Sequence, residues 1–327
     1  MKHLRKFAGA IAIALVLAGC GSDDGAAGST AAPSATTAGA ADSEQASSAA
    51  PGEGQAEESK YERIVAVNAE TADLALMLVG PENIAAISET AQSPHMGQVP
   101  ELAEQVNNTL PPGIEPDAEQ ILSFNPDLVL ITPRAHGTME SVRDQLVATG
   151  VETHQFTPTD FDSPEGYASA IRELGEILGV PAKAEELASE FEQRIAELDE
   201  QKGDKSPSMI ALMARGPSIM VYGETNALPG LAMRAGATNA AADLGLTKTS
   251  PIDAEQLLKA NPDIIFLEDF NGAGMAPFEA MLADPALAEV AAIKNDRIVL
   301  IPMTEASTLA GLNMVTGYEK ILAEVQK

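Results

Sequence analysis

The chain has 327 residues, of which 48 are acidic and 20 basic, so its formal net charge at pH 7 is −28. A chain this acidic shows no basic face that could bind phosphates, which excludes nucleic acid as an expected partner. It contains one cysteine and therefore forms no internal disulfide.

The first segment in chain order is an export signal. In residues 1–19, three basic residues precede an apolar run from Phe7 to Gly19 that is too short to span a bilayer comfortably. The run ends in "LAGC", residues 17–20, which resembles the lipobox of bacterial lipoproteins, where the cysteine is acylated and begins the mature chain. We expect Cys20 to carry a lipid, and an ordinary cleavage site with an incidental cysteine is the alternative.

Residues 20–60 are predicted to be a disordered tether that follows the lipidated cysteine. After Cys20 this segment contains no aromatic or large aliphatic residue. Such a composition cannot bury enough apolar surface to offset the entropy lost on ordering. The folded part of the protein would then begin at Tyr61.

Residues 61–162 are predicted to form a first lobe in which strands and helices alternate. The first expected helix ends at Gly80, a residue type that commonly terminates helices. The expected elements outside the repeat described next are strands at 63–68, 83–88 and 152–156 and helices at 69–80 and 139–150.

One fifteen-residue segment occurs twice in the sequence. "DAEQILSFNPDLVLI" (117–131) and "DAEQLLKANPDIIFL" (253–267) agree at eight of fifteen positions. In each copy an Asp with a Gln three residues later predicts a reciprocally capped short helix, and Asn-Pro stops that helix. The apolar residues that follow predict a strand buried on both faces of a parallel sheet. Each copy is thus interpreted as helix, turn and buried strand.

Residues 163–202 are predicted to be connecting helices, and residues 203–327 a second α/β lobe. In the second connecting helix, apolar residues recur at helical spacing over some twenty residues. These are Leu187, Phe191, Ile195 and Leu198. The second lobe is expected to contain strands at 208–214, 218–223 and 297–303, the second copy of the repeat, and helices at 228–236 and near 278–284.

Together these features resemble the helical-backbone class of ABC-transporter substrate-binding proteins, which serves ferric siderophores, haem and cobalamin. The resemblance rests on "YERIVAVN", "IEPDAEQILSFNPDLVLI", "VYGETNALPGLAMRAGATNAAADLG" and "SPIDAEQLLKANPDIIFL" and covers nearly all of 61–327. It implies an α/β fold with two Rossmann-like lobes joined by a single long α-helix, and a ligand cleft between the lobes. A bilobed binder would use two copies of one architecture to clamp its ligand.

The resemblance also implies a function. The chain would be a monomeric binding protein without enzymatic activity or a resident cofactor, lipid-anchored at the extracytoplasmic face of the cell membrane. It would capture an iron chelate, a ferric siderophore or haem, and deliver it to an ABC permease and its ATPase subunits. Cobalamin is an alternative ligand within the same class.

Ligand contacts are predicted at the carboxyl ends of the strands, where open α/β sheets collect their ligands. For each such residue, a solvated loop position is the alternative. The predicted set is Asn68, Glu70, Arg134, His136, Arg215, Tyr222, Glu268, Phe270 and Met303.

Four of these residues are favoured by their chemistry. The guanidinium groups of Arg134 and Arg215 could pair with the anionic oxygens of a chelate or a porphyrin. His136 and Tyr222 could instead ligate a haem iron, since both residue types do so. For Tyr222, a half-buried aromatic with a hydrogen-bonded hydroxyl is the competing interpretation.

The family pattern implies one acidic residue on each lobe that contacts arginines of the permease. Glu104 occupies the position that resembles the first of these. The second lobe departs from the pattern, because Met233 and Arg234 stand where an acid is expected. Glu224 is the nearest acidic candidate there.

Three other classes of protein are alternatives to this interpretation. A free zinc or manganese binder requires several converging imidazoles, and the exported chain has only His95, His136 and His154. An exported hydrolase is disfavoured because the mature chain has no G-x-S-x-G, H-E-x-x-H or Gly-rich phosphate loop. A surface adhesin would have no ligand cleft.

Overall fold

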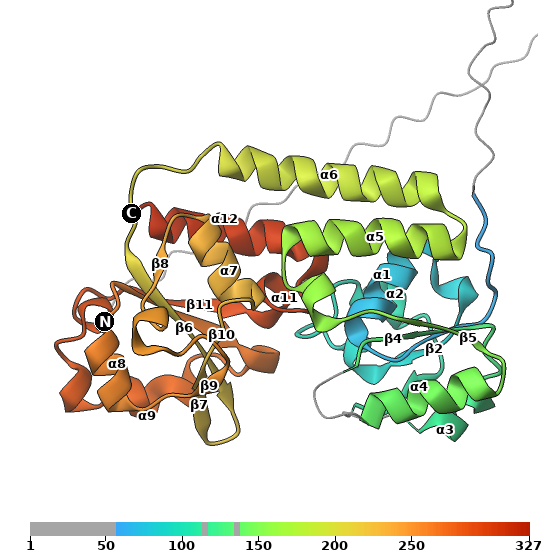
Figure 1. Cartoon of the computed structure of the whole chain (residues 1–327), viewed down its shortest axis with the longest axis horizontal. Coiled ribbons are helices and arrows are strands. Elements are labelled where there is room, and N and C mark those ends of the chain that lie inside the picture. The colour runs from blue at the N-terminus through green and yellow to red at the C-terminus, as the bar shows by residue number, and fades with distance from the viewer. Residues whose placement is uncertain (1–56, 113–116, 134–137) are drawn as a thin grey trace, which may run out of the picture. The chain divides into compact units, whose positions relative to one another are not determined.

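The computed structural model describes residues 57–112, 117–133 and 138–327 (Figure 1). Residues 55–327 form one compact unit. Among the described residues, no helix is long and apolar enough to cross a membrane. Cys20 and the predicted signal and tether up to residue 56 lie outside the described residues.

The first lobe contains a five-stranded parallel sheet in the order β3-β2-β1-β4-β5. Helices α1 and α5 cover one face of this sheet, and α3 and α4 cover the other (Figure 1). Its elements are β1 (Ile64–Ala66), α1 (Ala69–Val79), β2 (Ile84–Ser88), α2 (Pro100–Ala103), β3 (Thr109–Leu110), α3 (Ala118–Ser123), β4 (Leu128–Ile131), α4 (Thr138–Ala148) and β5 (Glu152–Gln155).

The second lobe contains a mixed sheet in the order β11-β10-β6-β7-β9, and β8 pairs with β6. Its elements are β6 (Ser208–Arg215), β7 (Ser218–Val221), α7 (Ala227–Arg234), β8 (Thr238–Asn239), β9 (Ser250–Pro251), α8 (Ala254–Ala260), β10 (Ile264–Asp269), α9 (Glu279–Leu282), α10 (Ala291–Lys294), β11 (Ile298–Pro302), α11 (Met303–Ala306) and α12 (Met314–Val325).

Strand β7 differs from the sequence-based expectation, which treated it like the parallel strands. It runs antiparallel to β6, and Arg215 pairs with Ser218 across a two-residue turn at Gly216 and Pro217. A connection of two residues can only reverse the chain, because a parallel crossover needs a dozen or more residues. Gly216 has a φ of 58°, the left-handed conformation that such hairpin turns require.

Both copies of the repeat fold as helix, turn and buried strand, as predicted. In the second copy, Asp253 accepts from the backbone N–H of Gln256, and the Gln256 side chain accepts from the N–H of Asp253. In the first copy, Asp117 accepts from the N–H of Glu119 instead, so the reciprocal cap forms once. The four residues of β4 are fully buried, as expected of a central strand.

The Asn-Pro-Asp part of each repeat forms a hydrogen bond to the backbone at the beginning of a neighbouring strand. Asn125 and Asn261 both adopt left-handed backbone conformations, with φ of 49° and 41°. The next Asp then accepts from the backbone at the beginning of the central strand: Asp127 from Arg63 before β1, and Asp263 from Ser208 in β6. In both copies the repeated segment therefore stabilises the pairing of its strand with the neighbouring one, β4 with β1 and β10 with β6.

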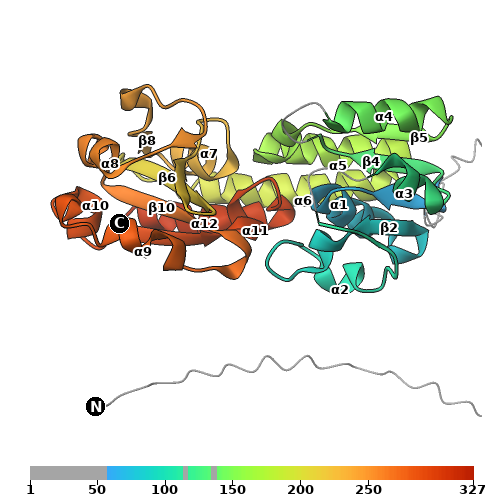
Figure 2. The same cartoon turned by 90° about the horizontal axis from the view of Figure 1, so that it is seen from below.

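Helices α5 (Pro164–Leu178) and α6 (Pro181–Asp199) follow the first sheet and precede the second. Ser163 accepts from the N–H of Gly166 at the start of α5, and Gly179 ends the helix with a φ of 81°. Helix α6 packs against both α5 and α12, and Figures 1 and 2 show it running beside α5.

One hydrophobic core extends through both lobes. It includes Leu74 of α1, Tyr167 of α5, Phe191 of α6, Met213 of β6 and Tyr318 of α12. Two smaller clusters lie under α3 and α4 and under α8 and α10, on the outer faces of the two sheets. The shared core explains why residues 55–327 behave as one compact unit although they contain two sheets.

Candidate functional site

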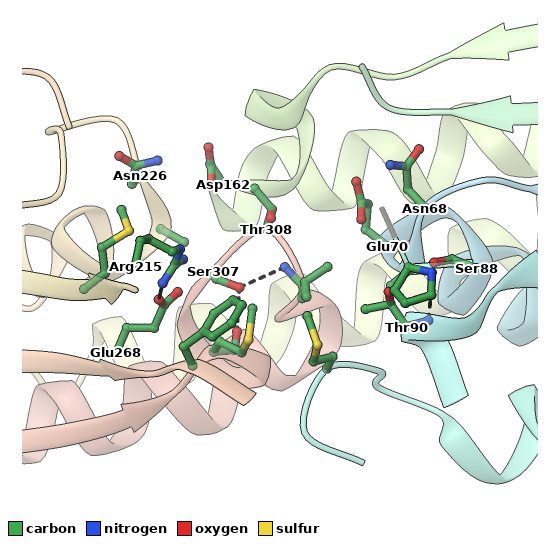
Figure 3. A pocket seen from close by; sticks show the side chains of 18 of the residues that line it. Asn68, Glu70, Ser88, Thr90, Asp162, Arg215, Asn226, Glu268, Ser307 and Thr308 are labelled. Atoms are coloured by element: carbon green, nitrogen blue, oxygen red, sulfur yellow. Dashed lines mark hydrogen bonds and ion pairs between the residues drawn. The ribbon is translucent and has the colours of Figure 1, made fainter. Parts of the chain in front are cut away.

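A cavity of about 610 Å³ is lined by residues of both lobes. Figure 3 shows Asn68, Glu70, Ser88 and Thr90 on one side of this cavity and Arg215, Asn226 and Glu268 on the other. The remaining labelled lining residues are Asp162, Ser307 and Thr308. The volume lies within the range of about 300–1,000 Å³ that small-molecule sites occupy.

The first-lobe wall is built where parallel strands end. Asn68 follows β1 at the N-cap position of α1, and its Oδ1 accepts from the backbone N–H of Thr132, which follows β4, at 2.7 Å. Glu70, in the first turn of α1, is fully buried and lines the cavity. Ser88 ends β2, and its Oγ accepts from the N–H of Thr90 at 3.3 Å. Two adjacent strand ends, those of β1 and β2, thus present amide, carboxylate and hydroxyl groups to one space.

The second-lobe wall contains a buried carboxylate with two partners. One oxygen of Glu268 pairs with the guanidinium Nη1 of Arg215 at 2.5 Å, and the other accepts from the hydroxyl of Tyr222. Glu268 is 2% exposed and Tyr222 6% exposed. The Arg215 guanidinium also lies 4.3 Å from the centre of the Phe270 ring. Of the two arginines predicted to pair with anionic oxygens of a ligand, Arg215 is therefore already paired within the wall.

The protonation states of this cluster follow from burial and from the carboxylate. Burial, reinforced by the charge and the hydrogen bond of Glu268, raises the pKa of Tyr222 well above its usual value. Burial lowers the pKa of Arg215, but the hydrogen bond and charge of Glu268 more than offset it, so the pKa is raised. At neutral pH, Tyr222 is thus a neutral hydrogen-bond donor and Arg215 a cation.

Seven of the nine predicted ligand contacts line the cavity. They are Asn68, Glu70, Arg215, Tyr222, Glu268, Phe270 and Met303. Arg134 and His136 lie outside the described residues. Direct contact with a ligand stays a prediction for all nine.

Tyr222 reaches the cavity for a reason other than the predicted one. Because β7 is antiparallel, its carboxyl end lies beside Ala211 and Leu212, several residues before the carboxyl end of β6. The side chain of Tyr222 still lines the cavity and meets Glu268 across the sheet. Glu224, two residues further on, is not among the residues that line the cavity.

Several lining residues were not predicted. Ser88 ends a parallel strand, so the rule that found Asn68 would also have found it. Asp162 precedes α5, and Ser307 to Leu309 follow α11, so no strand pattern marks these loops. The unpredicted polar members are Ser88, Thr90, Asp162, Asn226, Ser307 and Thr308.

The departure at Arg234 from the docking pattern has a structural explanation. Its guanidinium pairs with Asp199 at the end of α6, at 2.7 Å, and with Glu165 in the first turn of α5. Asp199 also accepts from the hydroxyl of Tyr318 in α12, at 2.7 Å. Arg234 therefore ties α7 to the paired helices. Glu104 is exposed at the end of α2, and its docking role stays a prediction, as does that of Glu224.

A chain of hydrogen bonds joins the two lobes. The fully buried Asp73 of α1 accepts from the backbone N–H of Gln98, and the Gln98 side chain accepts from the N–H of Leu312 in the second lobe, at 3.0 Å each. Burial raises the pKa of Asp73 to about 7, and the charge of Glu70 adds to this, although the N–H groups of Gln98 and Val99 oppose it.

This raised pKa predicts a dependence of stability on pH. Asp73 is protonated in the folded state up to about pH 7, whereas in the unfolded chain it ionises near 3.8. Its contribution to stability is therefore full below the unfolded pKa and is lost as pH rises through about 7. Between pH 5 and pH 8 the wild type should therefore lose roughly 2–3 kcal/mol of unfolding free energy that the Asp73→Asn variant does not lose.

Urea unfolding of both proteins at the two pH values measures this effect. Asp263→Asn is the matched control, because Asp263 also accepts a backbone N–H but lies in an exposed position. Equal changes in the wild type and the Asp73→Asn variant would show that Asp73 titrates normally in the fold.

A sequence profile of the periplasmic binding protein family matches residues 64–304. The chain belongs to this family. Its members are periplasmic solute-binding proteins and not enzymes, which confirms the resemblance inferred from the sequence. The family relationship covers both lobes and the helices between them.

The similar proteins include binders of several iron and cobalt compounds. Ferric-anguibactin-binding protein FatB of Vibrio anguillarum is 25% identical over 215 residues, which make up 62% of this chain and 66% of that protein. The periplasmic haem-binding protein RhuT of Roseiflexus shares the fold with a TM-score of 0.68 and 24% identity, over 81% of this chain and 98% of RhuT. The vitamin B12-binding protein BtuF of Vibrio cholerae does so with a TM-score of 0.63 and 19% identity, over 81% and 98%. These structural likenesses establish the two-lobe fold.

Proposed function

We propose that this protein captures a ferric siderophore outside the cytoplasmic membrane and delivers it to the permease of an ABC importer. The observation that carries the proposal is the cavity of about 610 Å³, which both lobes line. Its walls combine apolar and aromatic side chains with hydroxyl, amide and charged groups, the mixture that a chelate with an organic backbone requires. The similarity to FatB, a protein named for binding a ferric siderophore, supports the same class of ligand.

Haem is the second candidate, because Tyr222 lines the cavity and tyrosine can ligate haem iron. Ligation would require the hydroxyl to leave Glu268, and its raised pKa opposes loss of the proton. This cost favours a siderophore, whose iron brings its own complete set of ligands. In a haem complex, Tyr222→Phe would shift the haem absorption bands, whereas in a siderophore complex it would leave the spectrum unchanged.

A thermal-shift screen with ferric siderophores, haemin and cobalamin tests the function. A ligand that binds only the folded state stabilises it by about 2.7 kcal/mol at a hundredfold excess over its Kd. We expect a ferric siderophore to raise the Tm by several degrees and cobalamin to leave it unchanged. If no compound raises the Tm, the proposed function is wrong.

The anchor at Cys20 is part of the proposal, because a tethered binder stays close to its permease. Cys20→Ser should release the protein from the membrane fraction or leave it unprocessed, and Ser34→Ala in the same segment should have no effect. Detergent partitioning of the two variants beside the wild type measures this. A Cys20→Ser protein that still partitions with detergent would exclude the lipid anchor.

The docking surface completes the proposal. Glu104 and Glu224 would contact basic residues of the permease, one from each lobe. Both lie apart from the residues that line the cavity, so their replacement should reduce uptake into cells and leave ligand affinity unchanged.

A further inference from the structure

A loop of the first lobe, residues 93–98, touches the second lobe at the edge of the cavity. It precedes α2, and Figure 2 shows the chain beside α2 reaching toward the second lobe. Met96 in this loop lines the cavity, whereas its neighbour His95 is exposed. The 93–98 loop is therefore a thin part of the cavity wall, with the cavity at one residue and solvent at the next.

Two glycines of the second lobe receive side chains of this loop. A Cβ at Gly272 would lie 2.9 Å from the ring of His95, and a Cβ at Gly311 would collide with the side-chain amide of Gln98. Both glycines have left-handed backbones, with φ of 71° and 49°. The Oε1 of Gln98 also accepts from the backbone N–H of Leu312 at 3.0 Å. We refer to these contacts between the lobes as the seam.

The seam borders the cavity from the second lobe as well. Phe270 lies two residues before Gly272, and Leu309 lies two residues before Gly311. Both Phe270 and Leu309 line the cavity, as does Met96 between the two contacting side chains of the loop. Separation of the lobes along the seam would therefore open the cavity to solvent.

The seam is weaker than the helical connection between the lobes. Its contacts are a neutral hydrogen bond and the packing of two side chains on backbone. In the helical connection, α6 packs on α5 and α12, and Tyr167, Phe191 and Tyr318 of these helices belong to the core shared by both lobes. Parting the helices would expose this buried apolar surface to water, whereas parting the seam would not.

The 93–98 loop is braced by its own lobe. Gly97 lies so close to the backbone carbonyl of Ala91 that no Cβ would fit there. The backbone N–H of Gln98 donates to the buried carboxylate of Asp73 in α1, at 3.0 Å. The loop therefore moves with the first lobe, and the seam separates when the two lobes part along this edge.

We propose, on the basis of the proposed function, that the seam is the gate through which the ligand enters and leaves the cavity. The lobes part between the 93–98 loop and the loops at Gly272 and Gly311, while α5, α6 and α12 stay packed and hold the lobes together. The two glycines allow the gate to close tightly on backbone, so that no interlocked side chains have to disengage when it opens.

Thiol labelling tests the gate without any ligand. A cysteine in place of Ser88, which is 6% exposed and lines the cavity, reacts with a maleimide when the cavity opens. Cys20→Ser in the same mature chain leaves this thiol as the only one. Gln98→Ala removes the hydrogen bond across the seam and should raise the labelling rate about threefold to tenfold, the factor that one neutral hydrogen bond supplies.

Two controls accompany this measurement. Gln105→Ala should not change the rate, because Gln105 donates to Glu101 within the first lobe. A cysteine in place of Ala188, which is buried in α6, should be labelled no faster in Gln98→Ala, because the helical core stays closed. Equal labelling at Ser88→Cys with and without Gln98→Ala would show that the cavity does not open at the seam.

A disulfide across the seam tests whether the ligand passes there. The Cγ of His95 lies 3.0 Å from the Cβ position of Gly272, so the Cβ of His95 lies within about 4.5 Å of it, a separation that a disulfide can bridge. In His95→Cys/Gly272→Cys with Cys20→Ser, oxidation should slow the binding of ferrichrome, a ferric tricatecholate or haemin by about tenfold or more. Dithiothreitol should restore the rate.

Lys60→Cys/Gly179→Cys is the matched control pair. Its two Cβ positions are 3.4 Å apart, its glycine has a φ of 81°, and neither residue lines the cavity. Oxidation of this pair should leave the binding rate unchanged. Equal rates in the oxidised and the reduced seam variant would overturn this inference and leave the proposed function standing. If none of the three probes binds the reduced protein, the proposed function fails, and the labelling rates still decide whether the seam opens.

Discussion

Replacing Glu268 with alanine is expected to lower the free energy of unfolding by about 3 kcal/mol. The substitution leaves the buried hydroxyl of Tyr222 without its acceptor and removes the anion that faces Arg215. The loss falls at the lower end of what breaking a buried ion pair costs, because the Arg215 side chain is 40% exposed and can be solvated by water. Urea unfolding, with the m value compared between variants, measures the change.

Two companion variants identify the cause. Glu268→Gln keeps an oxygen that can accept from Tyr222 and should cost less than Glu268→Ala. Adding Tyr222→Phe to the alanine variant removes the unpaired hydroxyl and should restore part of the stability, whereas Tyr222→Phe alone should cost about 1 kcal/mol. An alanine variant that unfolds at the same urea concentration as the wild type would show that the cluster does not stabilise the fold.

Replacing Gly175 with leucine is expected to cost about 3 kcal/mol or more. A Cβ at this position of α5 would lie 2.1 Å from the Cβ of Ala184 in α6, so the two helices could not keep their present separation. Overpacking of this kind commonly costs 1–3 kcal/mol for a few methylene groups, and here the contact involves helix positions that side-chain rotation cannot relieve. Because α6 also packs on α12, the displacement would disturb the core shared by both lobes.

Gly230 provides the matched control. It lies inside α7, and a Cβ there would meet nothing within 4 Å. Gly230→Ala should therefore leave stability unchanged or raise it by about 0.5–1 kcal/mol through helix propensity, whereas Gly175→Ala should lower it. Thermal unfolding of the two alanine variants distinguishes tight packing from propensity, and equal effects would show that α5 and α6 are not closely packed at Gly175.

Local patterns were reliable where the physical cause is itself local. Gly80 ends α1 at the predicted residue, and the two copies of the repeat form the predicted helix and strand. Helix α6 spans Pro181–Asp199, close to the twenty residues expected from its apolar spacing. Capping, helix periodicity and buried apolar runs depend on residues only a few positions apart, so one sequence suffices to recognise them.

The strand-end rule found most of the cavity wall but did not describe its electrostatics. It placed Asn68, Glu70 and Arg215 correctly at the cavity, because parallel strands bring their carboxyl ends together. It could not show that Glu268 already balances Arg215, since these residues lie 53 positions apart and meet only when β6 and β10 pair. An arginine that appears free to bind an anion was thus a paired group.

The sequence by itself determined the α/β elements, the internal repeat, the family and the strand ends from which the site is built. Only the tertiary structure decided that β7 runs antiparallel, that Arg234 pairs with Asp199 and Glu165, and that the loop at Ser307 reaches the cavity. The physical reason is range: backbone propensities act between neighbours in the chain, whereas ion pairs and cavity walls form between side chains that only the completed fold brings within a few ångströms of one another.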